Sequence, residues 1–226
     1  MTNPSLAHQK AEELRESDRH LEALKLLEEA LVGYEKEKNY SGFIKALHSR
    51  VLTYKHLSLL FDDLSFAVLA QKDGEAALEI AKRNNLGELL SACCFKIGEI
   101  EMLFEDYEKA SENYQKSVEN YTGSKAEKGD FTYHWGEAVW KSGDKKRGKE
   151  LMLEGLSIIQ ANRSETDQFL IHVWESGAYM RLAECLIEDK PEEASKYFKE
   201  GKKIVEADEK LVIRKRQYQE LAKKFS

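Results

Sequence analysis

Apolar and polar residues along this chain recur with the period of an α-helix. One clear example is a face on which residues recur at intervals of three, four and three: Tyr107, Ala110, Tyr114 and Ser117. Residues at this spacing lie on one side of a helix. No run of alternating β-branched residues indicates a strand. The pattern therefore predicts an all-α fold.

A second predicted helix precedes this one and pairs with it. It ends at a short turn followed by Asp106, which is suited to cap the next helix by accepting from its free N–H groups. The small residues Gly98, on the first helix, and Ala110, on the second, allow the two helices to approach closely. The rings of Tyr107 and Tyr114 are expected to fill the volume around them.

The pair of small residues seven positions apart in the second helix recurs along the chain. All ten members are Ala, Gly or Ser: Ala23/Ala30, Ala67/Gly74, Ala110/Ser117, Gly148/Gly155 and Ala194/Gly201. The first members of successive pairs are 44, 43, 38 and 46 residues apart. This recurrence predicts five helix pairs in a row. Their expected extents are 4–38, 41–84, 87–122, 127–161 and 166–206, followed by a capping helix over 209–225.

The helix pair resembles a tetratricopeptide repeat (TPR), which has a small residue in the first helix and an aromatic–Ala–aromatic ladder in the second. A strict repeat of this family is about 34 residues long, so these units resemble a variant with longer helices or joins. The resemblance implies a single domain over 1–226, built as a right-handed α-solenoid of antiparallel helix pairs. It also implies that the first helices line a concave surface where ligands bind.

Local signals set the expected helix boundaries. Pro4 and Pro191 stand where a helix begins, since proline is tolerated in the first turn. Ser41 is expected to cap the third helix, and Asp62 or Asp63 to begin the fourth. Later first helices are expected over Phe131–Trp140 and Thr166–Glu188, after a break at Thr122–Ser124.

Composition and charge narrow the function classes. Of the 226 residues, 34% are charged and 42% hydrophobic, which is typical of amphipathic helices. A net charge of −6 disfavours binding to nucleic acid or to an anionic membrane. No apolar run approaches the roughly 18 residues of a membrane span, and Met1–Lys10 lacks the pattern of a signal peptide, so we expect a cytoplasmic protein. The basic cluster Arg214–Arg216 with Lys223 and Lys224 is expected to be the solvated face of the capping helix.

Side chains suited to catalysis are sparse. Cys93, Cys94 and Cys185 lack zinc-ligand spacing and are expected to be thiols in a reducing compartment. No metalloprotease, nucleophile-elbow, phosphate-loop or dinucleotide motif occurs. His134 stands three residues before Glu137, so the two could form an acid–base pair on one helical face. Neither a nucleophile nor a metal-ligand set accompanies them in the sequence.

The most informative positions for binding lie on the first helices of the later units. Counted from the small residue, the same three slots recur in each unit, and i, i+4 and i+7 share a face. They contain Phe95, Glu99 and Met102, then Tyr133, Glu137 and Trp140, then Met180, Glu184 and Ile187, with His134 beside the middle set. We interpret them as a groove with apolar anchors and a column of glutamates. The alternative is that the apolar residues pack between helices and the glutamates are ordinary solvated side chains.

These patterns favour a protein- or peptide-binding scaffold without catalysis, cofactor or metal. A glutamate column predicts a partner that presents basic residues with apolar side chains between them. One alternative is a regulatory sensor that closes around a short signalling peptide. A second is an enzyme or enzyme subunit that uses the surface of His134 and Glu137. Self-association through the ends of the array is a third.

Overall fold

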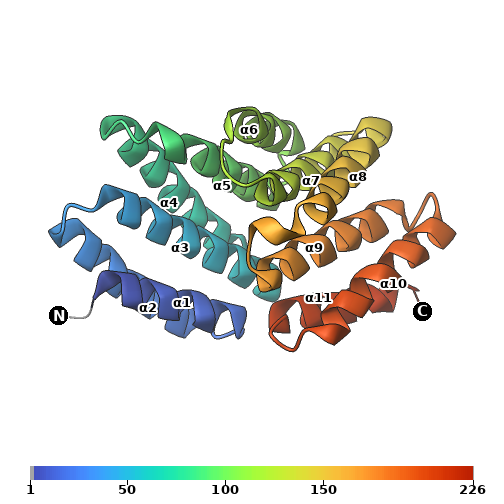
Figure 1. Ribbon diagram of the computed structural model, residues 1–226, viewed down its shortest axis with the longest axis horizontal. Coiled ribbons are helices and arrows are strands. Elements are labelled where there is room, and N and C mark those ends of the chain that lie inside the picture. Colours follow the sequence, from blue (N-terminus) through green and yellow to red (C-terminus); the bar gives the residue numbers. More distant parts are fainter. Residues whose placement is uncertain (1–2, 226) are drawn as a thin grey trace. The chain divides into compact units, whose positions relative to one another are not determined.

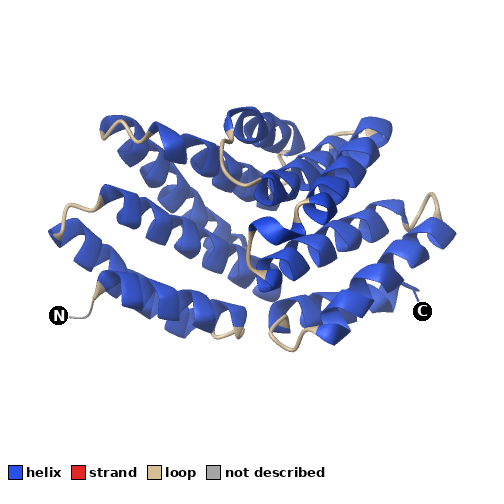
Figure 2. Cartoon of the chain, viewed as in Figure 1, coloured by secondary structure: helices blue, strands red, loops and turns tan. Residues whose placement is uncertain are grey.

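The computed structural model of this protein describes residues 3–225, which contain eleven α-helices, three short 3₁₀ helices and no strand (Figures 1 and 2). The all-α prediction is confirmed. Met1, Thr2 and Ser226, which the predicted domain 1–226 includes, lie outside the described residues. Within 3–225, every helix is too short or too polar to cross a membrane. The elements are α1 (Pro4–Glu16), α2 (His20–Lys36), α3 (Tyr40–Phe61), α4 (Leu64–Arg83), η1 (Gly87–Leu89), α5 (Leu90–Leu103), α6 (Tyr107–Asn120), α7 (Lys125–Lys141), α8 (Lys145–Ala161), η2 (Arg163–Glu165), α9 (Gln168–Leu186), α10 (Pro191–Ala207), α11 (Val212–Ala222) and η3 (Lys223–Phe225).

The chain divides into two compact units, Met1–Tyr121 and Thr122–Ser226. The division falls at the break that the sequence places at Thr122–Ser124. In the first unit, each helix from α1 to α6 packs against the next one in the chain. In the second unit, α7 packs on α8, α8 on α9, and α9 on α10, while α11 contacts both α9 and α10. Each unit is thus built mainly from contacts between consecutive helices.

Polar side chains fix where most helices begin. Asp63 and Asp106 accept hydrogen bonds from the first turns of α4 and α6, as predicted. The prediction of Ser41 as the cap of the third helix is wrong, because Asn39 accepts from the Gly42 N–H at 2.9 Å and the helix begins at Tyr40. The helix that contains the expected first-helix pattern of Phe131–Trp140 is longer than that pattern. Ser124 caps α7, so this helix begins at Lys125.

The turns between helices depend on residues in the left-handed region of backbone space. Six residues in the described chain have positive φ: Asp18 (62°), Lys38 (56°), Asp62 (52°), Asn85 (56°), Glu105 (59°) and Gly143 (114°). A left-handed residue reverses the chain directly after a helix, which leaves the next helix beside the one just completed. Five of the six carry a side chain, although glycine adopts this conformation at the lowest cost.

The recurring small residues lie in helix contacts, as predicted. Six of them are 0% exposed: Ala23, Ala30, Ala67, Ala110, Ser117 and Ala194. The other four, all glycines, are buried too. In the central pair, a Cβ atom on Gly98 would lie 2.8 Å from Cδ1 of Tyr114, so this glycine faces the aromatic ladder of α6. The packing inferred from the sequence for the central pair is therefore present.

The closest helix contact lies between α7 and α8, where glycines from both helices meet. A Cβ atom on Gly136 would lie 2.6 Å from the Met152 nitrogen and 2.7 Å from the Gly148 oxygen. A Cβ atom on Gly155 would lie 2.5 Å from the Gly129 oxygen. The obstacles here are backbone atoms, which cannot move aside as the end of a side chain can.

The last helix covers apolar residues of the second unit. Tyr218 and Leu221 of α11 are buried in a cluster with Met180 and Phe198. The Tyr218 hydroxyl also donates to the Ser176 carbonyl at 2.8 Å. We expected the basic residues 214–216 to be fully solvated, but they are half-buried. Arg214 donates to the Val173 carbonyl at 3.1 Å, so this arginine helps to hold α11 on α9.

The glycine contact predicts a large effect from a single methyl group. Gly136→Ala should destabilise the protein by about 1–3 kcal/mol, because the added Cβ meets backbone atoms that must shift. The matched control is Gly87→Ala, whose Cβ would meet nothing within 4 Å and should change stability by less than about 0.5 kcal/mol. Urea unfolding of the two variants checks this. Equal stability would mean that α7 and α8 are not in contact at Gly136.

Candidate functional site

The first level of predicted anchors is buried in both units. Phe95, Tyr133 and Met180 are 4%, 2% and 2% exposed, so the prediction that they are exposed on a groove is wrong. The reason is their position one turn before a small residue. Phe95 precedes Gly98 by three residues, so both point toward α6, and the Phe95 ring lies 5.3 Å from that of Tyr114.

In the first unit, Glu99 is buried among cations. The side chain is 3% exposed, and its two carboxylate oxygens accept from Lys55 at 2.7 Å and from Lys96 at 2.5 Å. Lys55 is on α3, so the contact joins two first helices of the unit. The negative charge of Glu99 is thus compensated by the protein itself.

In the second unit, Glu137 occupies a similar environment. It is 4% exposed, and its carboxylate lies 2.9 Å from Arg181 Nε and 3.1 Å from Lys141 Nζ. Arg181 also donates to Glu184, at 2.8 Å. Burial alone would raise the pKa of Glu137, but the charges of Arg181 and Lys141, with a smaller contribution from His134, outweigh burial and lower the pKa to about 2. Glu137 therefore stays ionised at neutral pH.

These contacts correct the predicted glutamate column. Glu99 and Glu137 are buried and ion-paired, so they do not present an exposed negative charge to a ligand. Glu184, with 31% of its side chain exposed, is the most accessible of the three, and it too pairs with Arg181. At the third predicted level, Met102, Trp140 and Ile187 are half-buried, and Trp140 packs against the apolar cluster of the second unit.

The geometry also bears on acid–base chemistry at His134. His134 Nδ1 lies 4.0 Å from Glu137 Oε2, and His134 Nε2 lies 3.9 Å from Asp130 Oδ1. Both separations exceed hydrogen-bond length. A carboxylate with a pKa of about 2 is also a weak base at neutral pH. Across residues 3–225, no three His, Cys, Asp or Glu side chains gather closely enough to hold a metal ion.

Three histidines on α1 and α3 of the first unit are buried or half-buried: His8, His48 and His56. His8 Nε2 lies 2.8 Å from the hydroxyl of Ser49, which donates to Glu12 at 2.9 Å. The buried nitrogens His48 Nε2 and His56 Nδ1 have no hydrogen-bond partner in the described chain. The sequence pattern did not bring these residues together.

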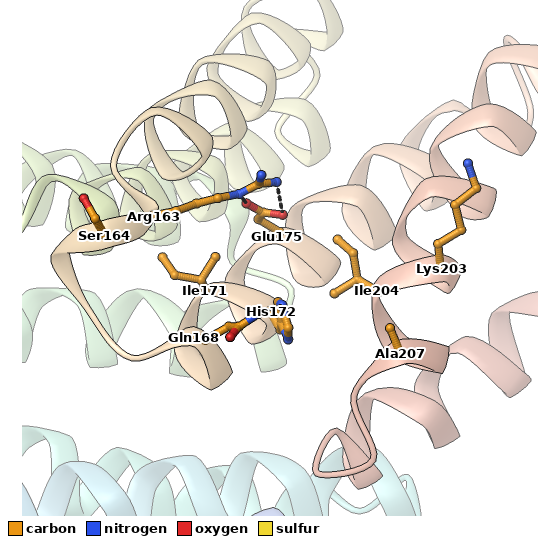
Figure 3. A pocket seen from close by; sticks show the side chains of 9 residues that line it. All are labelled: Arg163, Ser164, Gln168, Ile171, His172, Glu175, Lys203, Ile204 and Ala207. Atoms are coloured by element: carbon orange, nitrogen blue, oxygen red, sulfur yellow. Dashed lines mark hydrogen bonds and ion pairs between the residues drawn. The ribbon is translucent and has the colours of Figure 1, made fainter.

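A cavity of about 620 Å³ lies within the second unit (Figure 3). It is formed where η2, the start of α9 and the end of α10 meet. Its walls are Arg163, Ser164, Gln168, Ile171, His172, Glu175, Lys203, Ile204 and Ala207. Sequence reasoning did not find this site. Its only local signal was the interruption of the helical pattern at 162–165.

Exposed apolar side chains gather where α3 ends and α4 begins. This surface, the α3–α4 tip, consists of Leu59 (55% exposed), Leu60 (39%), Phe61 (61%), Leu64 (56%), Val68 (47%) and Leu69 (46%). The Phe61 ring lies 6.1 Å from that of Phe66, whose ring stacks on Tyr54 at 6.4 Å. Nothing in the sequence pattern marked these six residues as exposed.

Comparison with known proteins adds little to this description. Neither a protein-family model nor a curated protein matches the chain. A similar solved structure is the crystal structure of BtubC (BKLC) from P. vanneervenii, at 17% sequence identity and a TM-score of 0.47. The match covers 97% of this chain and 91% of that one. A likeness this weak says nothing about function.

The buried ion pairs predict a strong dependence on Arg181. Arg181→Met should cost about 3–5 kcal/mol, since it leaves the Glu137 carboxylate buried without its closest cation. Arg147→Met is the control, because Arg147 is exposed and its pair with Glu150 spans 3.8 Å; we expect a loss of about 1 kcal/mol or less. Chemical unfolding of both variants at pH 7 measures the difference. Equal losses of stability in the two variants would show that the buried ion pairs of Arg181 contribute no more than an exposed ion pair does.

The environment of His48 predicts destabilisation in mild acid. Burial and the nearby Lys96 lower the pKa of His48 from 6.5 to about 3, against the opposing charge of Glu99. Between these two values the unfolded chain binds a proton that the folded chain excludes, so stability is lost as pH falls below 6.5. From pH 7 to pH 5, His48 should cost about 2 kcal/mol. Wild type should therefore lose about that much more than His48→Gln in urea unfolding, and parallel losses would contradict the assignment.

Proposed function

We propose that this protein is a non-catalytic scaffold that binds another protein through the α3–α4 tip. The supporting observation is six large apolar side chains, each between 39% and 61% exposed, on adjoining parts of two helices. Soluble proteins rarely leave contiguous apolar surface in water without a binding role. Burying a Leu or Phe side chain contributes about 1.5–3 kcal/mol, so a few of these residues would suffice to anchor a partner.

Charge supports a partner with basic residues. Residues 1–121 contain 22 acidic and 15 basic residues, a net charge of −7, whereas residues 122–226 contain 19 acidic and 20 basic residues, a net charge of +1. The acidity of the chain is therefore concentrated in the unit that carries the α3–α4 tip. Asp62 and Asp63 lie exposed between its two helices. We therefore expect the partner to present a segment with Lys or Arg beside apolar side chains. Its charges would set the binding preference, and its apolar groups would supply most of the affinity.

We further propose that the helix pairs form a right-handed, TPR-like solenoid of antiparallel pairs. The burial of all ten recurring small residues and the contact of Gly98 with Tyr114 support this architecture. In such arrays the first helices offer a second surface for a ligand. Met102 in the first unit, and Trp140 and Ile187 in the second, are the accessible apolar residues there.

We propose a cytoplasmic location on the basis of the thiols. Cys93, Cys94 and Cys185 are all free. Burial raises the pKa of Cys93 and of Cys185 to about 12, so neither is poised to react at neutral pH. Free, unreactive cysteines accord with a reducing compartment.

Panning a displayed peptide library on the full chain tests the binding role. Wild type should select peptides that combine Lys or Arg with large apolar residues. Phe61→Ser with Leu64→Ser should weaken the selected peptides at least about tenfold, because two anchors are lost. Leu21→Ser is the matched control, since Leu21 is 71% exposed on α2, away from the tip in sequence, and should have no effect.

Asp62→Asn provides an independent test of the charge preference. Asn tolerates the left-handed backbone of position 62, so the turn should persist. The variant should bind the selected peptides with a weaker dependence on salt. Selection of acidic peptides, unchanged binding by the double serine variant, or self-association of wild type through this surface would each contradict the proposal.

A further inference from the structure

The cavity of the second unit is independent of the proposed protein-binding surface, and its chemistry points to a ligand of its own. At about 620 Å³ it lies within the range of small-molecule sites, roughly 300–1,000 Å³. Ile171 of α9 and Ile204 of α10 form apolar walls, and the polar groups come from η2 and the facing sides of the two helices (Figure 3). The site thus combines an apolar body with a few placed polar groups.

The buried carboxylate of Glu175 holds the guanidinium of Arg163, the main polar group of the cavity. Glu175 is 2% exposed and accepts two hydrogen bonds from Arg163, one from Nε and one from Nη2, the latter at 2.8 Å (Figure 3). This two-point contact holds the plane of the guanidinium. Arg163 itself belongs to a three-residue 3₁₀ turn, and 57% of its side chain is exposed. Glu175 therefore acts as the positioning residue and Arg163 as the group that it presents.

The positioned guanidinium retains unused donors. Arginine has five N–H groups, and the contact with Glu175 uses two of them. Within the described residues, the other three have no protein acceptor. Ser164 of the same turn and Lys203 of α10 also line the cavity, but their side chains point away from the guanidinium (Figure 3).

The acceptors in the walls are largely engaged. The Glu175 carboxylate is committed to Arg163, and His172 Nδ1 lies 2.8 Å from Asp208. His172 Nε2 lies 3.3 Å from the amide nitrogen of Gln168. Lys203 Nζ donates to Glu200 at 2.7 Å, so the free N–H donors of this lining are those of Arg163. A ligand that matches it carries negative charge and hydrogen-bond acceptors.

We propose that this cavity binds a small organic carboxylate with an aliphatic body. The carboxylate accepts from the unused edge of the Arg163 guanidinium. The aliphatic body packs between Ile171 and Ile204. A cationic ligand would have to displace Arg163 from Glu175, whereas an anion leaves that buried pair intact. The geometry thus favours the acid over the corresponding amine.

Three small molecules of similar shape but different charge test whether binding depends on the negative charge of the ligand. The full chain is titrated with 4-methylvalerate, with its amide and with 4-methylpentylamine, followed by saturation-transfer NMR and thermal unfolding. The acid should bind and raise the melting temperature, and the amide and amine should bind roughly tenfold or more weakly, since each lacks a charge-assisted bond to Arg163. Equal binding of acid and amide, tighter binding of the amine, or no binding of the acid would overturn the proposal.

Variants place the binding in this cavity. Arg163→Gln combined with Glu175→Gln removes the donor fork without leaving a buried charge unpaired, and should weaken the acid roughly tenfold or more. Ala207→Trp adds a large ring at the exposed rim and should also block binding, with no change in the charged groups. Arg147→Gln, at an exposed arginine of α8, is the control and should bind as wild type does. If folded samples of both cavity variants bind the acid normally, the site is elsewhere and the proposal fails.

Discussion

Close approach between consecutive helices is the constraint on which this structure depends. Each recurring pair of small residues removes side-chain bulk from a helix contact, and in α7 and α8 the contact is so close that backbone meets backbone at Gly136 and Gly148. Once two helices approach this closely, the residues one turn before the small positions are also enclosed. Phe95 and Tyr133 are therefore core residues, and what remains for a ligand on these helices lies further along, at Met102 and Trp140.

On the first helices of the helix pairs, buried glutamates are ion-paired with lysine or arginine side chains of the protein itself. Glu99 and Glu137 lie on surfaces that the sequence alone suggested were open, and each is enclosed with two cations. A buried, compensated carboxylate contributes to the uniqueness of the packing more than to attraction of a partner. The binding role proposed above therefore rests on apolar surface outside these networks, at the α3–α4 tip.

The parts that could be predicted from the sequence were local ones. Helical periodicity, the small residues and the caps at Asp63 and Asp106 involve neighbours within a few residues, so the sequence shows them directly. The burial of Glu99 depends on Lys55, which lies 44 residues away, and no local pattern encodes that pairing. The cavity likewise requires a 3₁₀ turn to meet the far end of α10. Periodicity also does not show which apolar residues of a helix remain in solvent, so the exposure of 59–61 could not be predicted.

The left-handed turns have a consequence for how this chain tolerates change. Lys38 and Glu105 hold a conformation that costs an ordinary side chain about 1–2 kcal/mol, whereas Asp and Asn adopt it more readily. These two positions therefore contain strain that no contact in the structure requires. Glycine at Glu105 would relieve it without touching a core or a binding surface, and glycine at Lys38 would remove only the exposed ion pair with Glu35. Glycine substitutions at these turns should thus stabilise the protein and could offset a destabilising substitution elsewhere in the chain.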